Sequence, residues 1–325
     1  MCVFCNQRSI SGKQGFCKDS IKREIDEALS TVESDAEVEI AYFGGSFTGI
    51  DSDLMIYLLD VAEEYVLNPK GDRAKVTGIR MSTRPDYING EIMEILSRYH
   101  VKTVELGLQS MCDEVLAASK RGHSALDAEA ACRLIKDAGY SLVGQMMIGL
   151  PKSTLENELY TARKICEMGA DGARIYPTVV FYDTELADMA ERGEYKMLDI
   201  EDAVQRSKEV LKIFDANNVE CIRIGLCASD NLLDKEKVMG GANHPSLGEL
   251  VIGEEYFDRM CFEAERIAAQ NDGGIITFTV PRGDISKAVG QKGRNRARLI
   301  EKHKNFKIVI KEANVPKLVS SFEKR

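Results

Sequence analysis

The chain has 325 residues, of which 44% are apolar and 29% charged, as in ordinary water-soluble proteins large enough for more than one domain. No apolar run approaches the roughly 18 residues of a membrane-spanning helix, and the first residues lack the basic and apolar regions of a signal peptide. These features argue against contact with a membrane and favour the cytoplasm. The nine cysteines are an odd number and mostly scattered, which suits reduced thiols better than a disulfide framework.

The net charge of −9 is unevenly spread along the chain. Residues 281–325 carry 13 Lys and Arg against 4 Asp and Glu, whereas the preceding residues carry 30 against 48. A basic C-terminal segment that follows an acidic region predicts two parts with different functions, and the basic part suggests a nucleic acid partner. A solvated lysine-rich tail is the alternative.

The chain begins with the letters MCVFC, which place two residues between Cys2 and Cys5. Zinc would need two further ligands at metal spacing, and no other cysteines or histidines are so spaced. A thioredoxin-type redox pair should follow a strand, and this one does not. Closely spaced cysteines also hold iron–sulfur clusters, and a cluster held by three thiolates leaves one iron open. Cys17 is a further candidate because it lies near this loop in the sequence. The other cysteines are expected to be core or incidental thiols, and the loop residues His123 and His244 are expected to be ordinary surface histidines.

Short apolar runs then alternate with amphipathic helical stretches in which apolar residues recur every three or four positions. This repeat predicts a parallel sheet covered by helices, either open or closed into a barrel. The helix at 20–32 has no strand before it, so the repeat begins with half a unit. The predicted strands are 38–43, 76–82, 103–108, 142–149, 172–180 and 219–226, and the predicted helices are 20–32, 53–66, 89–100, 126–139, 154–169 and 200–218.

Distinctive residues follow the strands, at the edge of the sheet where such proteins place their chemistry. Gly44, Gly45 and Ser46 end the first strand, Arg84 follows the second and Gln109 the third, and the letters GLP follow the fourth. Glycine permits close approach of a ligand to the backbone. Each feature also has a plain structural explanation: a tight strand exit, a turn pair of Arg84 with its neighbour Asp86, or a helix cap at Gln109.

After about residue 227 the repeat is lost. Residues 239–251 read as a loop, a helix is expected around 253–270, and a Gly-Gly break suggests a domain boundary near 272. The remaining residues predict a strand, a helix, the letters GQKG at 290–293, a second helix and a second strand. We therefore expect three parts: a barrel at 1–226, a connecting loop and helix at 227–272, and a basic module at 273–325.

Taken together, the strand-end motifs resemble the radical S-adenosylmethionine (SAM) superfamily, and residues 2–260 resemble the radical domain of the Elongator catalytic-subunit family. The segments that carry this resemblance are MCVFC, YFGGSFTGI, STRPDYI, VELGLQS, GQMMIGLP and RIYPTVVFYDTELADMAERGEY. The resemblance implies a partial (β/α)6 barrel whose 4Fe–4S cluster cleaves SAM reductively to a 5′-deoxyadenosyl radical. It implies cluster ligation by Cys2 and Cys5, and SAM contacts from Gly44, Gly45, Ser46, Arg84 and Gln109.

The superfamily motif is Cys-x-x-x-Cys-x-x-Cys, so its first cysteine would fall four residues before Cys2. The missing strand and the missing ligand both lead to the expectation that the natural chain is longer at this end. Replacement of that ligand by Cys17 is the competing idea. Residues 273–325 do not resemble the acetyltransferase part of the Elongator family, so the resemblance implies radical chemistry rather than acetyl transfer.

The GQKG segment resembles the Gly-x-x-Gly loop of KH domains, which clamps single-stranded nucleic acid through its backbone. The resemblance implies RNA contacts from Gly290, Gln291, Lys292, Gly293 and Arg294, with a small helical cap bearing a solvated basic face as the alternative. The resulting hypothesis is a radical SAM enzyme that modifies RNA, most plausibly tRNA, with an electron donor such as ferredoxin or flavodoxin. The alternatives are an oxygen-independent coproporphyrinogen oxidase-like enzyme acting on a tetrapyrrole, and a non-catalytic RNA-binding protein.

Overall fold

The computed structural model describes residues 2–5, 17–69, 74–226, 232 and 234–324, and these form two compact units. Unit 1 comprises 1–199 and 210–243, and unit 2 comprises 200–209 and 244–325. Each unit is described by itself below. No helix among the described residues is both long and apolar enough to cross a membrane.

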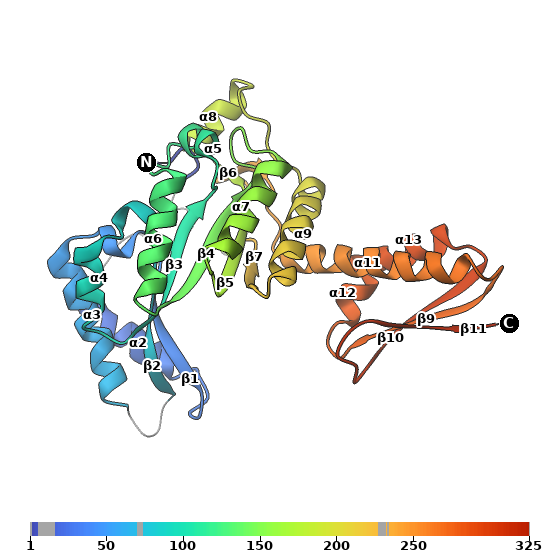
Figure 1. Cartoon of the computed structure of the whole chain (residues 1–325), viewed down its shortest axis with the longest axis horizontal. Helices are drawn as coiled ribbons and strands as arrows, with labels where there is room; N and C mark the ends of the chain where they lie inside the picture. Colours follow the sequence, from blue (N-terminus) through green and yellow to red (C-terminus); the bar gives the residue numbers. More distant parts are fainter. Residues whose placement is uncertain (1, 6–16, 70–73, 227–231, 233, 325) are drawn as a thin grey trace. The chain divides into compact units, whose positions relative to one another are not determined.

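Unit 1 is built on a six-stranded parallel sheet in the order β1-β2-β3-β4-β5-β7 (Figure 1). All six strands predicted from the sequence are present, and they form the expected partial barrel of parallel strands. In the centre of the sheet, Val104, Leu106 and Leu108 of β3 share one face of the strand and are fully buried. The strands are β1 (Glu37–Tyr42), β2 (Lys75–Thr83), β3 (Val101–Gln109), β4 (Ser141–Ile148), β5 (Gly172–Pro177) and β7 (Glu220–Ile224).

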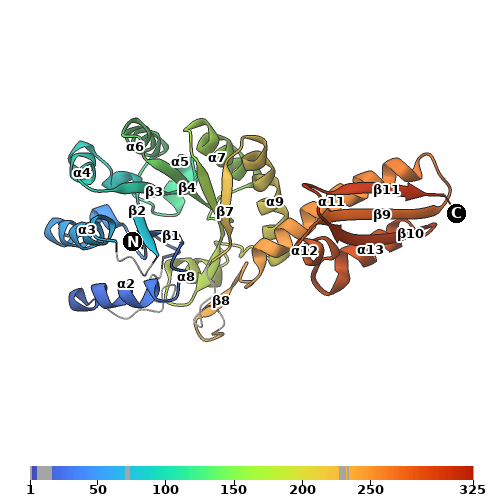
Figure 2. The same cartoon turned by 90° about the horizontal axis from the view of Figure 1, so that it is seen from below.

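The six strands curve, and the helices that connect them lie on the outer side of the curve (Figure 2). Capping boxes at Ser124 and Thr154 fix the starts of two of these helices by satisfying exposed backbone N–H groups. All six predicted helices are found: α2 (Ile21–Leu29), α3 (Ser52–Leu67), α4 (Gly90–Leu96), α6 (Ala125–Asp137), α7 (Leu155–Glu167) and α9 (Ile200–Ala216). Residues 200–209 of α9 group with unit 2.

Several short elements were not anticipated from the sequence. The predicted loop at 239–251 is wrong, because it contains β8 (Val238–Gly241) and the first residues of α11 (Leu247–Ala268). β8 pairs antiparallel with β6 (Val179–Phe181), a pairing between distant residues that no local pattern reveals. Among the described residues of unit 1, the sequence analysis also missed the helices α5 (Asp113–Ala118) and α8 (Glu185–Glu191) and the 3₁₀ turns η1 (Lys18–Ser20), η2 (Phe47–Gly49) and η3 (Pro85–Tyr87).

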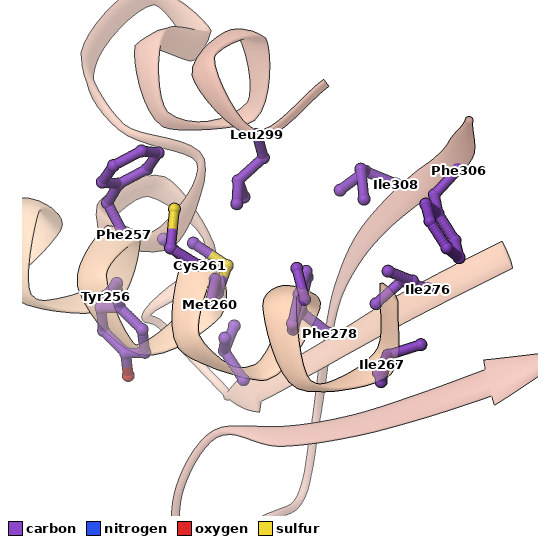
Figure 3. Packing of buried hydrophobic residues seen from close by; sticks show 13 residues of the cluster. Tyr256, Phe257, Met260, Cys261, Ile267, Ile276, Phe278, Leu299, Phe306 and Ile308 are labelled. Atoms are coloured by element: carbon purple, nitrogen blue, oxygen red, sulfur yellow. The ribbon is translucent and has the colours of Figure 1, made fainter. Parts of the chain in front are cut away.

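Unit 2 packs three helices on a three-stranded sheet of order β10-β9-β11, with β9 parallel to β10 and antiparallel to β11. Its core joins Tyr256, Phe257 and Met260 of α11 to Phe278 of β9 and Leu299 of α13 (Figure 3). The strand–helix–GQKG–helix–strand order expected from the sequence is present, and only the last strand was missed. The elements are β9 (Gly274–Pro281), α12 (Ile285–Val289), η4 (Gln291–Gly293), α13 (Arg294–Lys302), β10 (Phe306–Ala313) and β11 (Val319–Glu323).

Candidate functional site

The loop that carries Cys2 and Cys5 is held against unit 1 by its middle residues. The backbone turns between the two cysteines, with the Cys5 amide donating to the Cys2 carbonyl at 3.1 Å. The Val3 amide donates to the Ser119 carbonyl at 3.2 Å, and the Val3 carbonyl accepts from the Leu186 amide at 2.9 Å. The Val3 side chain is fully buried beside Leu186. The loop is thereby fixed beside the segment after α5 and the start of α8, with Cys2 buried and Cys5 half-buried.

Arg121 lies directly against Cys2. Its Nη1 atom donates to Cys2 Sγ at 3.2 Å, and its Nη2 atom donates to the Gly107 carbonyl at 2.7 Å. The side chain is buried, and Gly107 belongs to the C-terminal half of β3. The sequence analysis missed this residue because nothing in the letters around it distinguishes a buried arginine from a surface one.

Arg84 joins the second strand end to the same place. It forms a two-point ion pair with Asp86, at 2.9 and 2.6 Å, which is the turn pair that the sequence allowed. Its Nη2 atom also donates to the Arg121 carbonyl at 2.6 Å. Arg84 therefore connects the loop after β2 with the residue that touches Cys2.

His123 is buried rather than exposed, so the expectation of an incidental surface histidine is wrong. Its Nε2 atom donates to the Leu108 carbonyl at 3.3 Å, which leaves Nδ1 as a bare acceptor. The nearest acidic group, Asp86 Oδ1, lies 4.0 Å from Nδ1, too far for a hydrogen bond. Burial, reinforced by the charge of Arg121, lowers the pKa of His123 to about 4, so the ring is neutral at pH 7.

Gln109 ends β3 in a left-handed backbone conformation with a φ of 67°. It caps no helix in the described structure, since α5 begins at Asp113 with Cys112 in the capping position. Its side-chain oxygen is buried without a hydrogen-bond partner among the described residues. Gly107 beside it could not carry a side chain freely, because a Cβ would lie 3.1 Å from Gln109 Nε2.

Buried polar atoms without partners gather around this point of the described structure. They are Gln109 Oε1, Ser119 Oγ, Arg121 Nε and His123 Nδ1. An unsatisfied buried polar atom costs about 1–3 kcal/mol, and native proteins rarely leave one without a reason. Four such atoms between residues 109 and 123, beside the cysteine loop, fit a site that takes a polar ligand.

The glycine loop after β1 leaves open space on its surface. A Cβ atom built on Gly44 or Gly45 would meet nothing within 4 Å, and the φ of 101° at Gly44 favours glycine there. Ser46 is half-buried and its side chain caps nothing in the 3₁₀ turn that follows. Thr48 ties this loop to the second strand end by sharing a 2.6 Å hydrogen bond with Thr83 and donating to the Tyr87 carbonyl at 2.7 Å. The loops after β1, β2 and β3 are thus linked in one row.

The inner face of the sheet carries a charged network that the sequence analysis did not identify. Fully buried Glu105 accepts two bonds from Arg174, at 2.7 and 2.8 Å, one from Arg80 at 3.1 Å and one from Gln145 at 2.8 Å. Arg80 also pairs with Glu39 at 2.8 Å. The available signal was one charged or amide side chain near the middle of each of five strands, namely Glu39, Arg80, Glu105, Gln145 and Arg174.

These residues fit a cluster and SAM in part. Two thiols lie on one fixed turn, Gly44 and Gly45 leave backbone accessible, and the unpartnered atoms beside Cys2 require polar partners. Among the described residues, no group of three or more His, Cys, Asp or Glu could hold a metal ion by itself. Cys17 is exposed, and Cys227 lies outside the described residues.

Comparison with known proteins identifies the family. The sequence matches the family description "Radical SAM superfamily" over residues 1–165 and "Radical_SAM C-terminal domain" over residues 170–256. The chain belongs to the radical SAM superfamily. It is therefore a radical SAM enzyme, and its cofactors are the 4Fe–4S cluster and SAM that this superfamily uses.

Among its relatives, the chain is 25% identical over 256 residues to a tRNA uridine(34) acetyltransferase of Methanocaldococcus jannaschii, covering 74% of this chain and 46% of the relative. It is 29% identical over 175 residues to Elongator complex protein 3 of Saccharomyces cerevisiae, covering 49% and 31%. The chain thus spans less than half the length of these two relatives. The solved structure of archaeal Methanocaldococcus infernus Elp3 with an N-terminal deletion shares the fold at a TM-score of 0.61 and 22% identity, covering 74% of this chain and 58% of that one.

Unit 2 offers a second candidate surface around the GQKG turn. Gly290, Lys292 and Gly293 all have φ between 53° and 78°, and a Cβ on Gly290 would lie 2.7 Å from Asn295. Asn295 is buried and donates to the Gly253 carbonyl of α11 at 2.7 Å, which fixes the start of α13 behind the turn. This geometry makes the first glycine of the motif obligatory.

A cavity of about 310 Å³ lies beside the turn. One side is formed by Gly290, Gln291, Lys292 and Arg294, and the other by the first residues of α9 and α11. Arg294 pairs there with Glu201 at 2.6 Å, an exposed contact that contributes little stability. Arg298, by contrast, is held by Glu254 at two points and lies over the Phe257 ring. Lys292 and Arg294 are therefore the basic side chains of the turn that remain exposed or only loosely held.

Proposed function

We propose that this radical SAM enzyme modifies RNA, with tRNA as its substrate class. The observation that carries the proposal is the likeness, over 74% of this chain, to a protein named tRNA uridine(34) acetyltransferase. The electron would come from a soluble donor such as ferredoxin or flavodoxin, and the site of action would be the cytoplasm. Because the chain spans 46% of that relative, the group added to the RNA is not carried over.

The residues proposed to hold the cofactors are those at the strand ends. Cys2 and Cys5 would ligate the cluster, and the open backbone at Gly44 and Gly45, together with the neighbouring Ser46, would receive the methionine end of SAM. When bound, the cluster and SAM supply a 5′-deoxyadenosyl radical by one-electron reductive cleavage. Gln109 and His123 would give their unpartnered acceptor atoms to hydroxyl or amino groups of the cofactor. Arg84, already engaged by Asp86, would act mainly by fixing the loop that carries Arg121.

The inner face of the sheet is the proposed place for the reacting part of the RNA. Phe43, the residue before the glycine loop, is 52% exposed, and the Arg174 guanidinium lies 5.8 Å from its ring centre. An exposed aromatic ring suits stacking of an unpaired base. Glu105 holds Arg174 in place, so the wall beside that ring is rigid and charged rather than freely hydrated.

Unit 2 would bind the RNA away from the reacting base. The turn Gly290-Gln291-Lys292-Gly293 with Arg294 resembles a KH loop, and a Cβ built on Gly293 would meet nothing within 4 Å. Residues 281–325 carry the net positive charge that attraction of a phosphate backbone requires. The topology that supports this proposal is the pair β9–α12 and α13–β10 enclosing the turn.

The proposal is tested by anaerobic reconstitution with iron and sulfide, reduction by dithionite and measurement of 5′-deoxyadenosine in the presence of SAM. Addition of unmodified tRNA is expected to increase 5′-deoxyadenosine formation and to produce a new nucleoside mass in the digested tRNA. Equal amounts of a DNA oligonucleotide and of coproporphyrinogen serve as controls. Stimulation by the tetrapyrrole but not by tRNA would contradict the proposal, as would RNA binding without any cleavage of SAM.

A further inference from the structure

Arg121 is an unusual residue in unit 1, because it is a buried cation without a carboxylate partner among the described residues. Only 5% of its surface is exposed. Its guanidinium has two hydrogen-bond acceptors, the Gly107 carbonyl and the Cys2 sulfur, and its Nε atom has none. A buried charge is costly unless an opposite charge or several hydrogen bonds compensate for it. The surroundings of Arg121 are therefore suited to a negatively charged group next to its guanidinium.

The position of Arg121 is fixed independently of Cys2. Its amide donates to the Leu116 carbonyl at 3.0 Å, which closes the end of α5, and its carbonyl accepts from Arg84. Two residues away, the Ser119 carbonyl receives the Val3 amide of the cysteine loop. The same short segment thus holds the loop through its backbone and reaches the sulfur through its side chain.

We propose that Arg121 is a positioning residue that orients the Cys2 sulfur and raises the reduction potential of the cluster. The inference rests on the proposed ligation of the cluster by Cys2. A cluster gains one negative charge when it accepts one electron from an external donor, with no bond made or broken. A guanidinium that donates to a ligand sulfur stabilises the more negative state, so the potential rises.

Matched variants separate this role from a purely structural one. Arg121→Met keeps the length of the side chain but removes the charge and both donors. Arg121→Lys keeps the charge and one donor group. Lys120→Met is the control, because it removes the same charge from the neighbouring residue, whose exposed side chain pairs with Glu185 at 2.5 Å.

The decisive measurement is the midpoint potential of the reconstituted cluster, from a dithionite titration followed by electron paramagnetic resonance. Arg121→Met is expected to make the potential more negative, Arg121→Lys to restore part of the difference, and Lys120→Met to leave the potential unchanged. An unchanged potential in Arg121→Met would overturn the inference. So would an equal shift in Lys120→Met, since the effect would then be one of general charge.

A second readout covers the case in which Arg121→Met binds too little iron. Co²⁺ added to the metal-free protein gives a sulfur-to-cobalt absorption band, which a hydrogen bond to the sulfur moves to shorter wavelength. The band is expected at longer wavelength in Arg121→Met than in the wild type, and an identical band would contradict the inference. Cys2→Ala is measured in parallel: full iron content in that variant would refute ligation by Cys2 itself, and with it both proposals for this residue.

Discussion

At the scale of single residues, the site is marked by buried side chains whose polar atoms lack hydrogen-bond partners among the described residues. Glycine positions could be recognised from the sequence because a glycine after a strand is visible in the letters. The burial of Arg121 and His123 could not, because both lie in a loop whose path depends on contacts with Leu108, Gly107 and Cys2. The sequence shows which residue stands at each position, but it does not show how deeply the side chain is buried.

Gly45→Val tests the proposed role of the glycine loop in SAM binding. The added side chain should block approach of the ligand to the backbone, whereas the fold should be unaffected, because a Cβ there meets nothing within 4 Å. Calorimetric titration of the reconstituted protein is expected to show SAM affinity at least tenfold lower. Gly90→Val is the control, since Gly90 also has free space around it and lies at the start of α4. Wild-type affinity in Gly45→Val would refute the assignment.

The neutral state of His123 predicts a dependence of stability on pH. The pKa of about 4 in the folded state lies below the ordinary 6.5, so the unfolded chain binds a proton that the folded one does not. The contribution of His123 is therefore complete above pH 6.5 and is lost as the pH falls toward 4. A pKa difference of about 2.5 corresponds to about 3 kcal/mol.

This dependence is measured by urea unfolding of the wild type and His123→Gln at pH 7 and pH 5. Glutamine does not titrate, so the variant should lose less unfolding free energy between the two pH values than the wild type does. The same loss in both proteins would show that His123 takes up no proton on unfolding in this range.

At the scale of elements, the sheet and its helices could be predicted because apolar periodicity is a local property. The six strands of the parallel sheet and the six predicted helices follow directly from the alternation along the chain. β8 and β11 could not be predicted in the same way, because each is short or exposed and is defined by its pairing with a distant segment. The predicted strand 172–180 merged β5 with the first residues of β6. The charged network across β1–β5 was not predicted for a related reason: each strand contributes one residue to it, and the contacts join residues far apart in the sequence.

Glu105→Gln tests how far that network supports the sheet. The buried carboxylate neutralises Arg174 and Arg80, and an amide in its place would leave two guanidinium groups without a full counter-charge. Loss of one partner of a buried ion pair costs about 3–5 kcal/mol, and the isosteric change should cost a large part of that. Calorimetry is expected to show a clearly lower unfolding temperature for unit 1. Glu39→Gln, at a position whose side chain is 23% exposed, is the control and should have a much smaller effect.

At the scale of the whole molecule, positive and negative charge lie in different parts of the sequence. The basic residues of 281–325 belong to unit 2, whereas most of the acidic excess lies in the residues before them. A division of labour between RNA binding and radical chemistry follows from this separation only if the GQKG turn contacts RNA. The predicted domain boundary near 272 remains a prediction, although α11 packs in the same core as β9.

The double change Gln291→Asp with Lys292→Asp tests the turn directly. Two carboxylates in place of one lysine and one amide should repel phosphates, so RNA affinity should fall at least tenfold and its salt dependence should flatten. Fluorescence anisotropy at several salt concentrations measures both quantities. The control is Lys304→Asp with Asn305→Asp, which changes the net charge equally at exposed positions beyond the other end of α13. Equal losses in the two variants would show that overall charge, and not the turn, governs binding.

The docking of Val3 has a consequence for the assembly of the cluster. Val3, one of the two residues between the cysteines, ties the loop to Ser119 and Leu186 through protein contacts alone. The conformational entropy of ordering the loop is therefore lost when unit 1 folds, and less remains to be lost when iron and sulfide arrive. The interval of two residues between Cys2 and Cys5 is constrained twice, by the metal chemistry and by a buried valine. A loop lengthened by one residue would lose the packing of Val3 as well as the spacing of the two thiols.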